Sequence, residues 1–113
     1  MIEVIQTVRR VDDGREFPVY DGRFMRREYP VTQVLEFVSS ARRRTLQANT
    51  SDVKFLYIVA PDGNDVPVRV FKNLSPEYWT FTERFIMFEV ANCTGVSFSS
   101  DSDVKLNILV CGE

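Results

Sequence analysis

The feature that most restricts the fold is a pair of segments, residues 53–60 and 80–90, that are apolar on both faces when read as β-strands. Neighbouring side chains in a strand point to opposite sides of the sheet, so each segment presents large apolar groups to both sides. The opposed sets are Phe55, Tyr57 and Val59 against Leu56 and Ile58, and Ile86, Phe88 and Val90 against Phe85 and Met87. Such strands are normally covered on both faces. The sequence therefore predicts a second covering layer, supplied either by residues 96–110 or by a partner chain or second copy.

Other segments also have the composition of strands. Residues 2–11 are rich in β-branched side chains and lead to an Asp13-Gly14 hairpin signal, and the strand pattern resumes after it. Residues 66–71 and 104–110 alternate apolar and polar side chains, with a turn sequence at residues 61–64 before the first of them. A chain of 113 residues has room for one core, so we expect a single domain over residues 1–113.

Residues 31–47 are predicted to form the one helix. Pro30 suits a first helical turn, and at 100° per residue the apolar side chains fall in one sector. The residues in this sector are Val31, Val34, Leu35, Val38, Ala41, Thr45 and Leu46. The pattern predicts that Val34, Leu35 and Val38 are buried. Arg42, Arg43 and Arg44 would then lie at the carboxyl end of the helix, where cations interact favourably with the helix dipole.

The order strand, strand, helix, strand, strand, strand resembles the β-grasp arrangement of ubiquitin-like domains, and "MIEVIQTV" at the start of the chain adds to that likeness. The expected fold class is therefore α+β, a ubiquitin-like β-grasp (ββαβββ) over residues 1–90 with an extra C-terminal β segment at 91–113. The chain has no di-glycine tail, which leaves a role as a conjugated modifier unsupported. "FIMFEV" also resembles the last strand of the N-terminal domain of kinetoplastid flagellar pocket collar scaffolds. That resemblance implies a docking module on a cytoskeletal protein.

The composition argues against several classes of activity. The chain has no histidine, and its two cysteines, Cys93 and Cys111, are far apart without metal-ligand spacing. We therefore expect no enzymatic activity, no metal and no cofactor, and we read both cysteines as buried, inert thiols. A net charge of -2 provides no positive electrostatic field that would attract nucleic acid. No apolar stretch is long enough to span a membrane. These features lead us to expect a cytoplasmic protein, and the resemblance to collar scaffolds implies association with the cytoskeleton.

The predicted function is a non-enzymatic protein–protein interaction module, the N-terminal docking domain of a larger intracellular scaffold. Trp and Tyr are enriched at interface hot spots, and arginine suits contact with acidic groups. The expected partner-binding residues are Tyr57, Tyr78, Trp79, Arg42, Arg43 and Arg44, with Arg9, Arg10, Arg26 and Arg27 extending a basic surface. The partner would be a protein or peptide, and a homo-oligomer is also open. The alternative is a small β-rich module that binds lipid or phosphate through an arginine-rich face.

Overall fold

The computed structural model describes residues 1–12, 14–63 and 65–113, and the side chains of these residues except those of 6–10, 12 and 16–26. Within this described part the chain forms ten strands and no helix. The strands are β1 (Ile2–Asp12), β2 (Arg15–Arg27), β3 (Val31–Ser39), β4 (Arg44–Thr45), β5 (Val53–Val59), β6 (Val68–Lys72), β7 (Tyr78–Phe81), β8 (Phe85–Cys93), β9 (Val96–Ser100) and β10 (Val104–Gly112).

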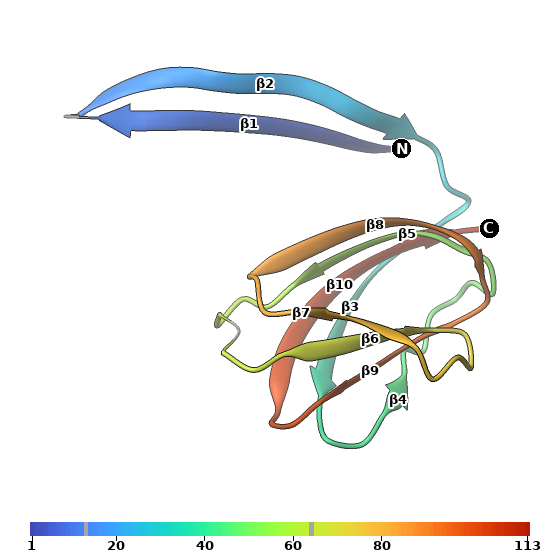
Figure 1. The fold of residues 1–113 in the computed structure, drawn as a ribbon. Coiled ribbons are helices and arrows are strands. Elements are labelled where there is room, and N and C mark those ends of the chain that lie inside the picture. Colours follow the sequence, from blue (N-terminus) through green and yellow to red (C-terminus); the bar gives the residue numbers. More distant parts are fainter. Residues whose placement is uncertain (13, 64) are drawn as a thin grey trace.

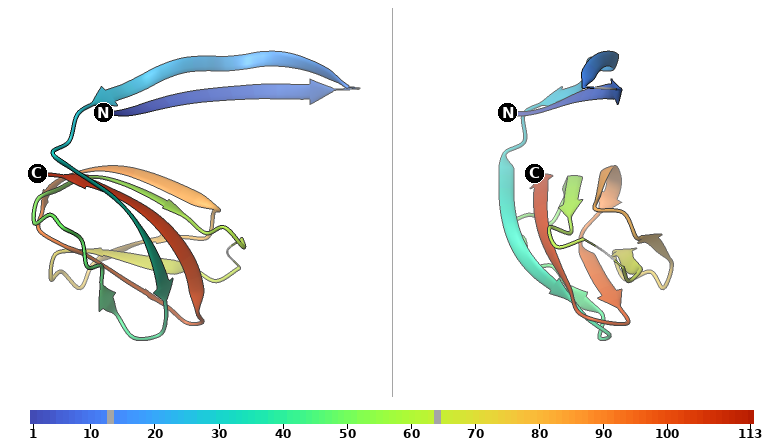
Figure 2. Two further views of the ribbon diagram at one scale, coloured as in Figure 1. Left: turned by 180° about the vertical axis from the view of Figure 1, so that it is seen from behind. Right: turned by 90° about the vertical axis from the view of Figure 1, so that its left-hand side faces the viewer.

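Eight of the strands build a sandwich of two antiparallel sheets, with strand orders β3-β10-β5-β8 and β4-β9-β6-β7 (Figure 1). The pairing is nested along the chain, because β6 pairs with β7, β5 with β8, β4 with β9 and β3 with β10. Two further pairings, β10 with β5 and β9 with β6, join these ribbons into the two sheets. Figure 2 shows the two layers from the side. Eight strands paired in this nested order and divided between two sheets form a jelly roll.

The first two strands form a separate hairpin. β1 and β2 pair antiparallel as a two-stranded sheet and lie over the outer side of the β3-β10-β5-β8 sheet. Gly14, the second residue of the predicted Asp13-Gly14 turn, has a φ of 77° in the left-handed region that glycine adopts readily. Asp13 and Asn64, from the turns predicted at 13–14 and 61–64, lie outside the described residues.

The predicted helix at residues 31–47 is wrong, because β3 occupies its first half. Val34 is 73% exposed and Val38 is 41% exposed, while Leu35 and Phe37 pack on the core. The spacing that suggested a helix arises within a segment rich in β-branched residues, which favour strands. Its inward set follows a period of two rather than 3.6 residues.

The expected α+β fold, a β-grasp with a C-terminal β segment added to it, is therefore overturned. A β-grasp requires a helix against its sheet, and the described chain has none. The segment after residue 90 is central rather than additional, since β9 and β10 are inner strands of the two sheets.

The inner faces of both sheets form one apolar core. Its fully buried members include Ile58, Phe98, Leu106 and Ile108. The segments 53–60 and 80–90 were expected to be apolar on both faces. This is confirmed for β5 and for β8, because Leu56 and Ile86 belong to this core whereas Phe55 and Met87 lie outside it. The predicted strand at 80–90 is itself divided between β7 and β8.

The second apolar face of β5 and β8 contributes to a smaller cluster on the outer side of the β3-β10-β5-β8 sheet. Phe55 and Cys111 are buried there, and Tyr57, Met87 and Leu109 are half-buried around them. The root of the hairpin packs on this cluster through Ile2 and Val4, and Tyr29 from the connection to β3 joins them. The outer face is thus partly covered by the chain's own first strand.

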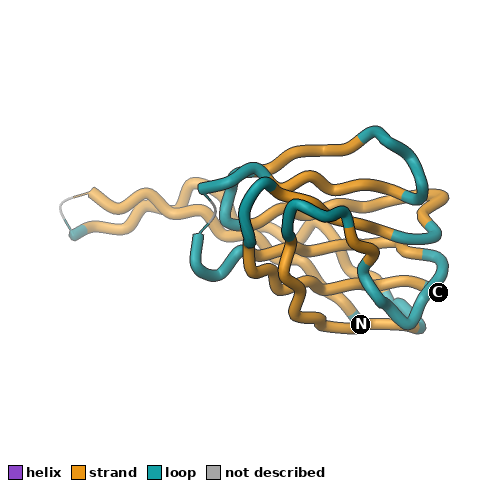
Figure 3. Tube along the Cα trace, turned by 90° about the horizontal axis from the view of Figure 1, so that it is seen from below, coloured by secondary structure: helices purple, strands orange, loops and turns teal. Residues whose placement is uncertain are grey.

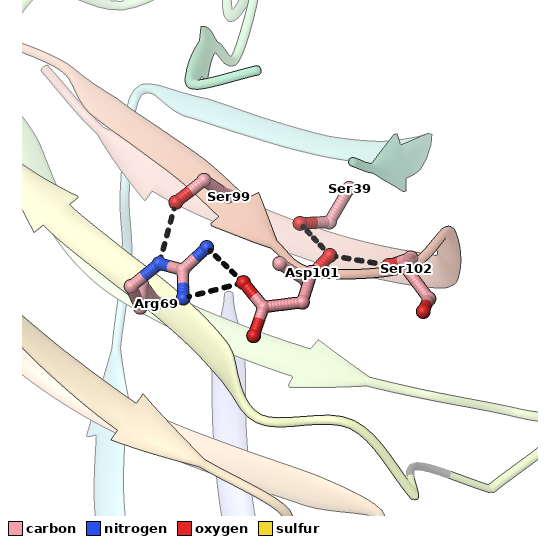
Figure 4. Close-up of polar contacts among 6 residues, drawn as sticks. Ser39, Arg69, Ser99, Asp101 and Ser102 are labelled. Carbon is pink, nitrogen blue, oxygen red and sulfur yellow. Dashed lines mark hydrogen bonds and ion pairs between the residues drawn. The ribbon is translucent and has the colours of Figure 1, made fainter. Parts of the chain in front are cut away.

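Polar side chains close the sandwich at one corner and line the outer face of the second sheet. Ser100 Oγ lies 2.8 Å from Ser39 Oγ and 2.8 Å from the Ser102 carbonyl oxygen. Arg69 Nε donates to Ser99 Oγ at 2.8 Å, and its other nitrogens contact Asp101 at 3.2 Å (Figure 4). This hydrogen bonding satisfies the serines that the sandwich buries.

Cys93 and Cys111 are both free and buried. Burial raises the pKa of each thiol above its usual value, since the thiolate is poorly solvated in the apolar surroundings of each residue. The thiols therefore remain protonated near neutral pH, which agrees with the expectation that they are buried and inert. No helix of the described chain is long and apolar enough to cross a bilayer.

Candidate docking site at the β6–β7 loop

Leu74, in the loop that joins β6 to β7, is the most exposed of the large apolar side chains that the structure describes. Its exposed fraction is 96%. Tyr78 and Trp79, the first two residues of β7, are 52% and 47% exposed. Three large apolar or aromatic groups therefore lie within six consecutive residues, in contact with solvent.

Arg43 holds this loop from the connection between β3 and β4. Its Nη1 donates to the Ser75 carbonyl oxygen at 2.9 Å and its Nη2 to the Asn73 carbonyl oxygen at 3.1 Å. Its Nε donates to Ser97 Oγ at 2.7 Å, and the guanidinium lies 3.9 Å above the centre of the Phe71 ring. The planar fork of arginine makes these contacts at the same time, which lysine cannot do.

A second brace comes from the turn between β8 and β9. The Asn73 side chain accepts from the Thr94 backbone N–H at 2.7 Å through Oδ1 and donates to the Asn92 carbonyl oxygen at 2.9 Å through Nδ2. Its backbone N–H donates to the Gly95 carbonyl oxygen at 2.8 Å. Asn73 has a φ of 57°, a left-handed conformation that asparagine tolerates better than most residues. The loop is thus held at both its start and its middle while Leu74 points into solvent.

The two aromatic residues of β7 belong to different surroundings because neighbours in a strand face opposite sides. The Tyr78 ring packs against Phe71 with centroids 5.2 Å apart, in the same group of contacts as Arg43. The Trp79 ring packs against Phe88 of the other sheet, with centroids 5.3 Å apart, and so closes the edge of the sandwich. A hollow of about 380 Å³ lies between them, lined by Lys72, Asn73, Ser75, Glu77, Tyr78 and Trp79.

The structure brings together three of the six residues predicted to bind a partner. Tyr78, Trp79 and Arg43 meet at this loop, although Arg43 acts as a brace beneath it. Tyr57 lies elsewhere, on the outer face of the first sheet, with its ring centroid 6.1 Å from that of Phe85.

The other two predicted residues, Arg42 and Arg44, line a second hollow of about 700 Å³ between β3 and β4, which Arg43 lines as well. The Arg44 guanidinium lies 4.9 Å from the centre of the Phe37 ring, and Glu36 lines the same hollow. The arginine run is therefore not a helix end: its three members line one hollow, and Arg43 also donates to the β6–β7 loop. The side chains of Arg9, Arg10 and Arg26 in the predicted basic surface lie outside the described residues.

Two residues of the site were missed by sequence reasoning. Leu74 stands alone among polar residues in "KNLSPE", and an apolar residue in a turn sequence was a signal that could have been used. The role of Asn73 depends on the β8–β9 turn, about twenty residues away in the chain. That proximity follows from the sheet order and has no local signal.

The chemistry available at this loop is that of recognition. Its apolar tip, the mixed charges of Lys72 and Glu77 and the polar wall of the hollow suit contact with another surface. In the described part of the chain no three Cys, Asp or Glu side chains group as a metal site would require. No family model, curated protein or solved structure matches the chain.

Proposed function

We propose that the chain is a non-enzymatic protein–protein interaction module that docks through the docking tip, defined as Leu74, Tyr78 and Trp79. The observation that supports this most directly is that a 96% exposed leucine stands on a loop held by Arg43 and Asn73. Exposing this side chain forfeits hydrophobic stabilisation that burial would supply. A loop ordered before binding loses less entropy when a partner covers it.

The expected partner is a protein or peptide with an apolar recess for Leu74 and a rim that complements Lys72 and Glu77. Aromatic residues with polar handles, such as Tyr78 and Trp79, supply contact area at low entropic cost. The helix on which the resemblance to ubiquitin-like domains depended is absent from the described chain, so that resemblance lends the proposal no support. Arg43 already donates to three protein acceptors, which disfavours a lipid or phosphate ligand at this loop.

Substitution at the docking tip should weaken the binding of a selected ligand. A peptide selected by display on the full chain provides the ligand, and calorimetry gives its dissociation constant. Leu74→Asp and Trp79→Ala should each weaken it by about 30-fold or more, the size of an interface hot spot of about 2 kcal/mol. The matched control is Val34→Asp, at a 73% exposed residue of β3, which should bind as the parent does. Ligands lost with Val34→Asp but kept with Leu74→Asp would refute the proposal.

Arg43→Lys tests whether the loop is held in place before binding. Lysine keeps the charge but cannot reach Ser97 and both loop carbonyls together, so the loop should open more often. We expect a loss of about 1–2 kcal/mol in the free energy of unfolding, in the range of one hydrogen bond to a charged group. Hydrogen exchange should quicken at the Ser75 amide, which donates to the Lys72 carbonyl oxygen in the loop turn. Arg42→Lys is the control, and equal effects of the two changes would contradict a bracing role.

A further inference from the structure

The hairpin of β1 and β2 extends well beyond the residues through which it packs on the sandwich. At about 3.3 Å per residue, the thirteen residues of β2 span about 43 Å. The hairpin runs well beyond the sandwich when the molecule is seen from below (Figure 3). Its root packs on the body through Ile2 and Val4, but Ile5 is 58% and Val11 is 62% exposed. No third strand of the described chain joins it, and isolated two-stranded hairpins are marginally stable in water.

The two outer edges of this hairpin differ in their ability to accept another strand. The register with β1 shifts twice, so that β2 has one unmatched residue at each shift and is bulged there. Pro18 also lies in β2 and has no N–H to donate. Bulges and proline are devices that keep an edge from pairing. β1 has neither proline nor glycine, and no residue of β1 is skipped in the register, so its edge is the one suited to pairing.

The sequence of β1 is complementary to itself in the antiparallel direction. Residues opposite one another in an antiparallel pair share a face, so an exact two-fold axis must place one residue opposite its own copy. With Gln6 on the axis, Glu3 of each copy lies opposite Arg9 of the other, and Val4 lies opposite Val8. Opposite charges and β-branched pairs at facing positions each stabilise a sheet by roughly 0.2–1 kcal/mol.

We propose that two copies of the chain associate through β1, in antiparallel register centred on Gln6, to form a continuous four-stranded sheet with the order β2-β1-β1-β2. The partner is a second copy because Glu3 and Arg9 of β1 face each other when the strand is reversed on itself, and because a two-fold pair gives both unpaired β1 edges a neighbour at once. Moving the axis by one residue to Thr7 would set Ile5 against Arg9 and remove the charge match. This interface is separate from the docking tip, so Leu74→Asp should leave it unchanged.

Cross-linking of the full chain tests the register. Cα atoms of directly opposed residues are about 4.5–5.5 Å apart, within the span of a disulfide. Gln6→Cys should therefore give a covalent dimer under mild oxidation. The control Thr7→Cys places cysteine opposite Ile5 of the second copy and should not cross-link efficiently. The native thiols are buried and do not compete. Equal cross-linking of the two variants, or none at position 6, would overturn the register.

Sedimentation equilibrium with adjacent charge reversals tests the pairing itself. The parent chain should be in a monomer–dimer equilibrium. Arg9→Glu creates two facing pairs of like charge with Glu3 and should raise the dimer dissociation constant at least tenfold. Arg10→Glu makes the same chemical change opposite Ile2 of the second copy and should have a much smaller effect. Within the hairpin register Arg9 is opposite Pro18, and Arg10 is opposite Phe17, so neither arginine directly faces an acidic residue of β2. A parent chain that stays monomeric at all concentrations, or equal effects of the two variants, would disprove the proposal.

Discussion

Replacing Phe98 with alanine should lower the free energy of unfolding by about 3–5 kcal/mol. Phe98 lies in β9 at the centre of the sandwich, is 0% exposed, and its ring packs 5.1 Å from that of Phe37 in the opposite sheet. Its neighbours in the sheet are Arg44 on β4 and Val70 on β6. Removing the ring leaves a cavity between two hydrogen-bonded sheets, which cannot collapse freely to fill it. Denaturant titration measures the loss.

Phe85→Ala is the matched control for this change. Phe85 is 54% exposed on the outer side of β8, where its ring contacts Tyr57. We expect a loss of about 1 kcal/mol or less, the size of a single aromatic contact. Comparable losses for Phe98→Ala and Phe85→Ala would show that the inner and outer faces of the sandwich have been assigned wrongly.

The second large effect is expected from Gly112→Ala, near the end of β10. A Cβ atom at this position would collide with the Asp52 carbonyl oxygen and would lie 2.7 Å from Thr50 Oγ1. The obstacle includes backbone, so a side-chain rotation cannot relieve it. Thr50 Oγ1 is itself held 2.6 Å from the Glu113 carbonyl oxygen. Overpacking of this kind costs about 1–3 kcal/mol or more, and thermal unfolding should show a corresponding fall in midpoint.

Gly95→Ala provides the comparison, because a Cβ atom there meets nothing within 4 Å and the residue does not require a left-handed backbone. Alanine also restricts the unfolded chain more than glycine does, so the change should be neutral or slightly stabilising. A Gly112→Ala variant as stable as Gly95→Ala would mean that the 50–52 segment is not held against β10.

Much of the strand content could be predicted from local pattern. The segments predicted at 53–60, 66–71 and 104–110 match β5, β6 and β10 within a few residues: the last two alternate apolar and polar residues, and the first is a short apolar run bounded by a turn sequence. The conflict between the two faces of β5 correctly required a second layer, but residues 96–110 do not supply it as one unit, because β9 lies in the opposite sheet and β10 lies beside β5 in the same sheet. The layer that covers its inner face is a full sheet, and the root of the hairpin covers the outer face.

The helix error has a local cause. Residues 31, 34, 35 and 38 have helical spacing, yet three of them are valines, which favour strands. Phe37 decided the outcome, because it enters the core with Leu35 on a period of two. On a helix Phe37 would have been at the flank of the apolar sector. When a segment of β-branched residues shows both the helical and the strand period, the tertiary packing available to it decides which structure forms.

The docking tip could be predicted only by residue type. Tyr78 and Trp79 were selected as aromatic residues in a loop-like sequence, without knowledge of what would lie beside them. The contacts of Arg43 with Asn73 and Ser75 join residues at least 30 positions apart, and they exist because the connection from β3 to β4 ends beside the β6–β7 loop. No local pattern records such a contact.

The nested pairing of the sandwich has a consequence for how the chain can fold. The turn from Lys72 to Tyr78 brings β6 and β7 together at the smallest cost in loop entropy, and each ribbon outside it closes a longer stretch of chain. β3 and β10 lie outermost, with everything from Ser39 to Val104 between them. If the strands zip outward from the centre, each new pairing needs only a short further closure, whereas pairing β3 with β10 first would have to order the whole intervening chain. The loop held by Arg43 therefore lies where the first pairing costs the least loop entropy. Along the same route the edge strand β3 is the last to join the sandwich.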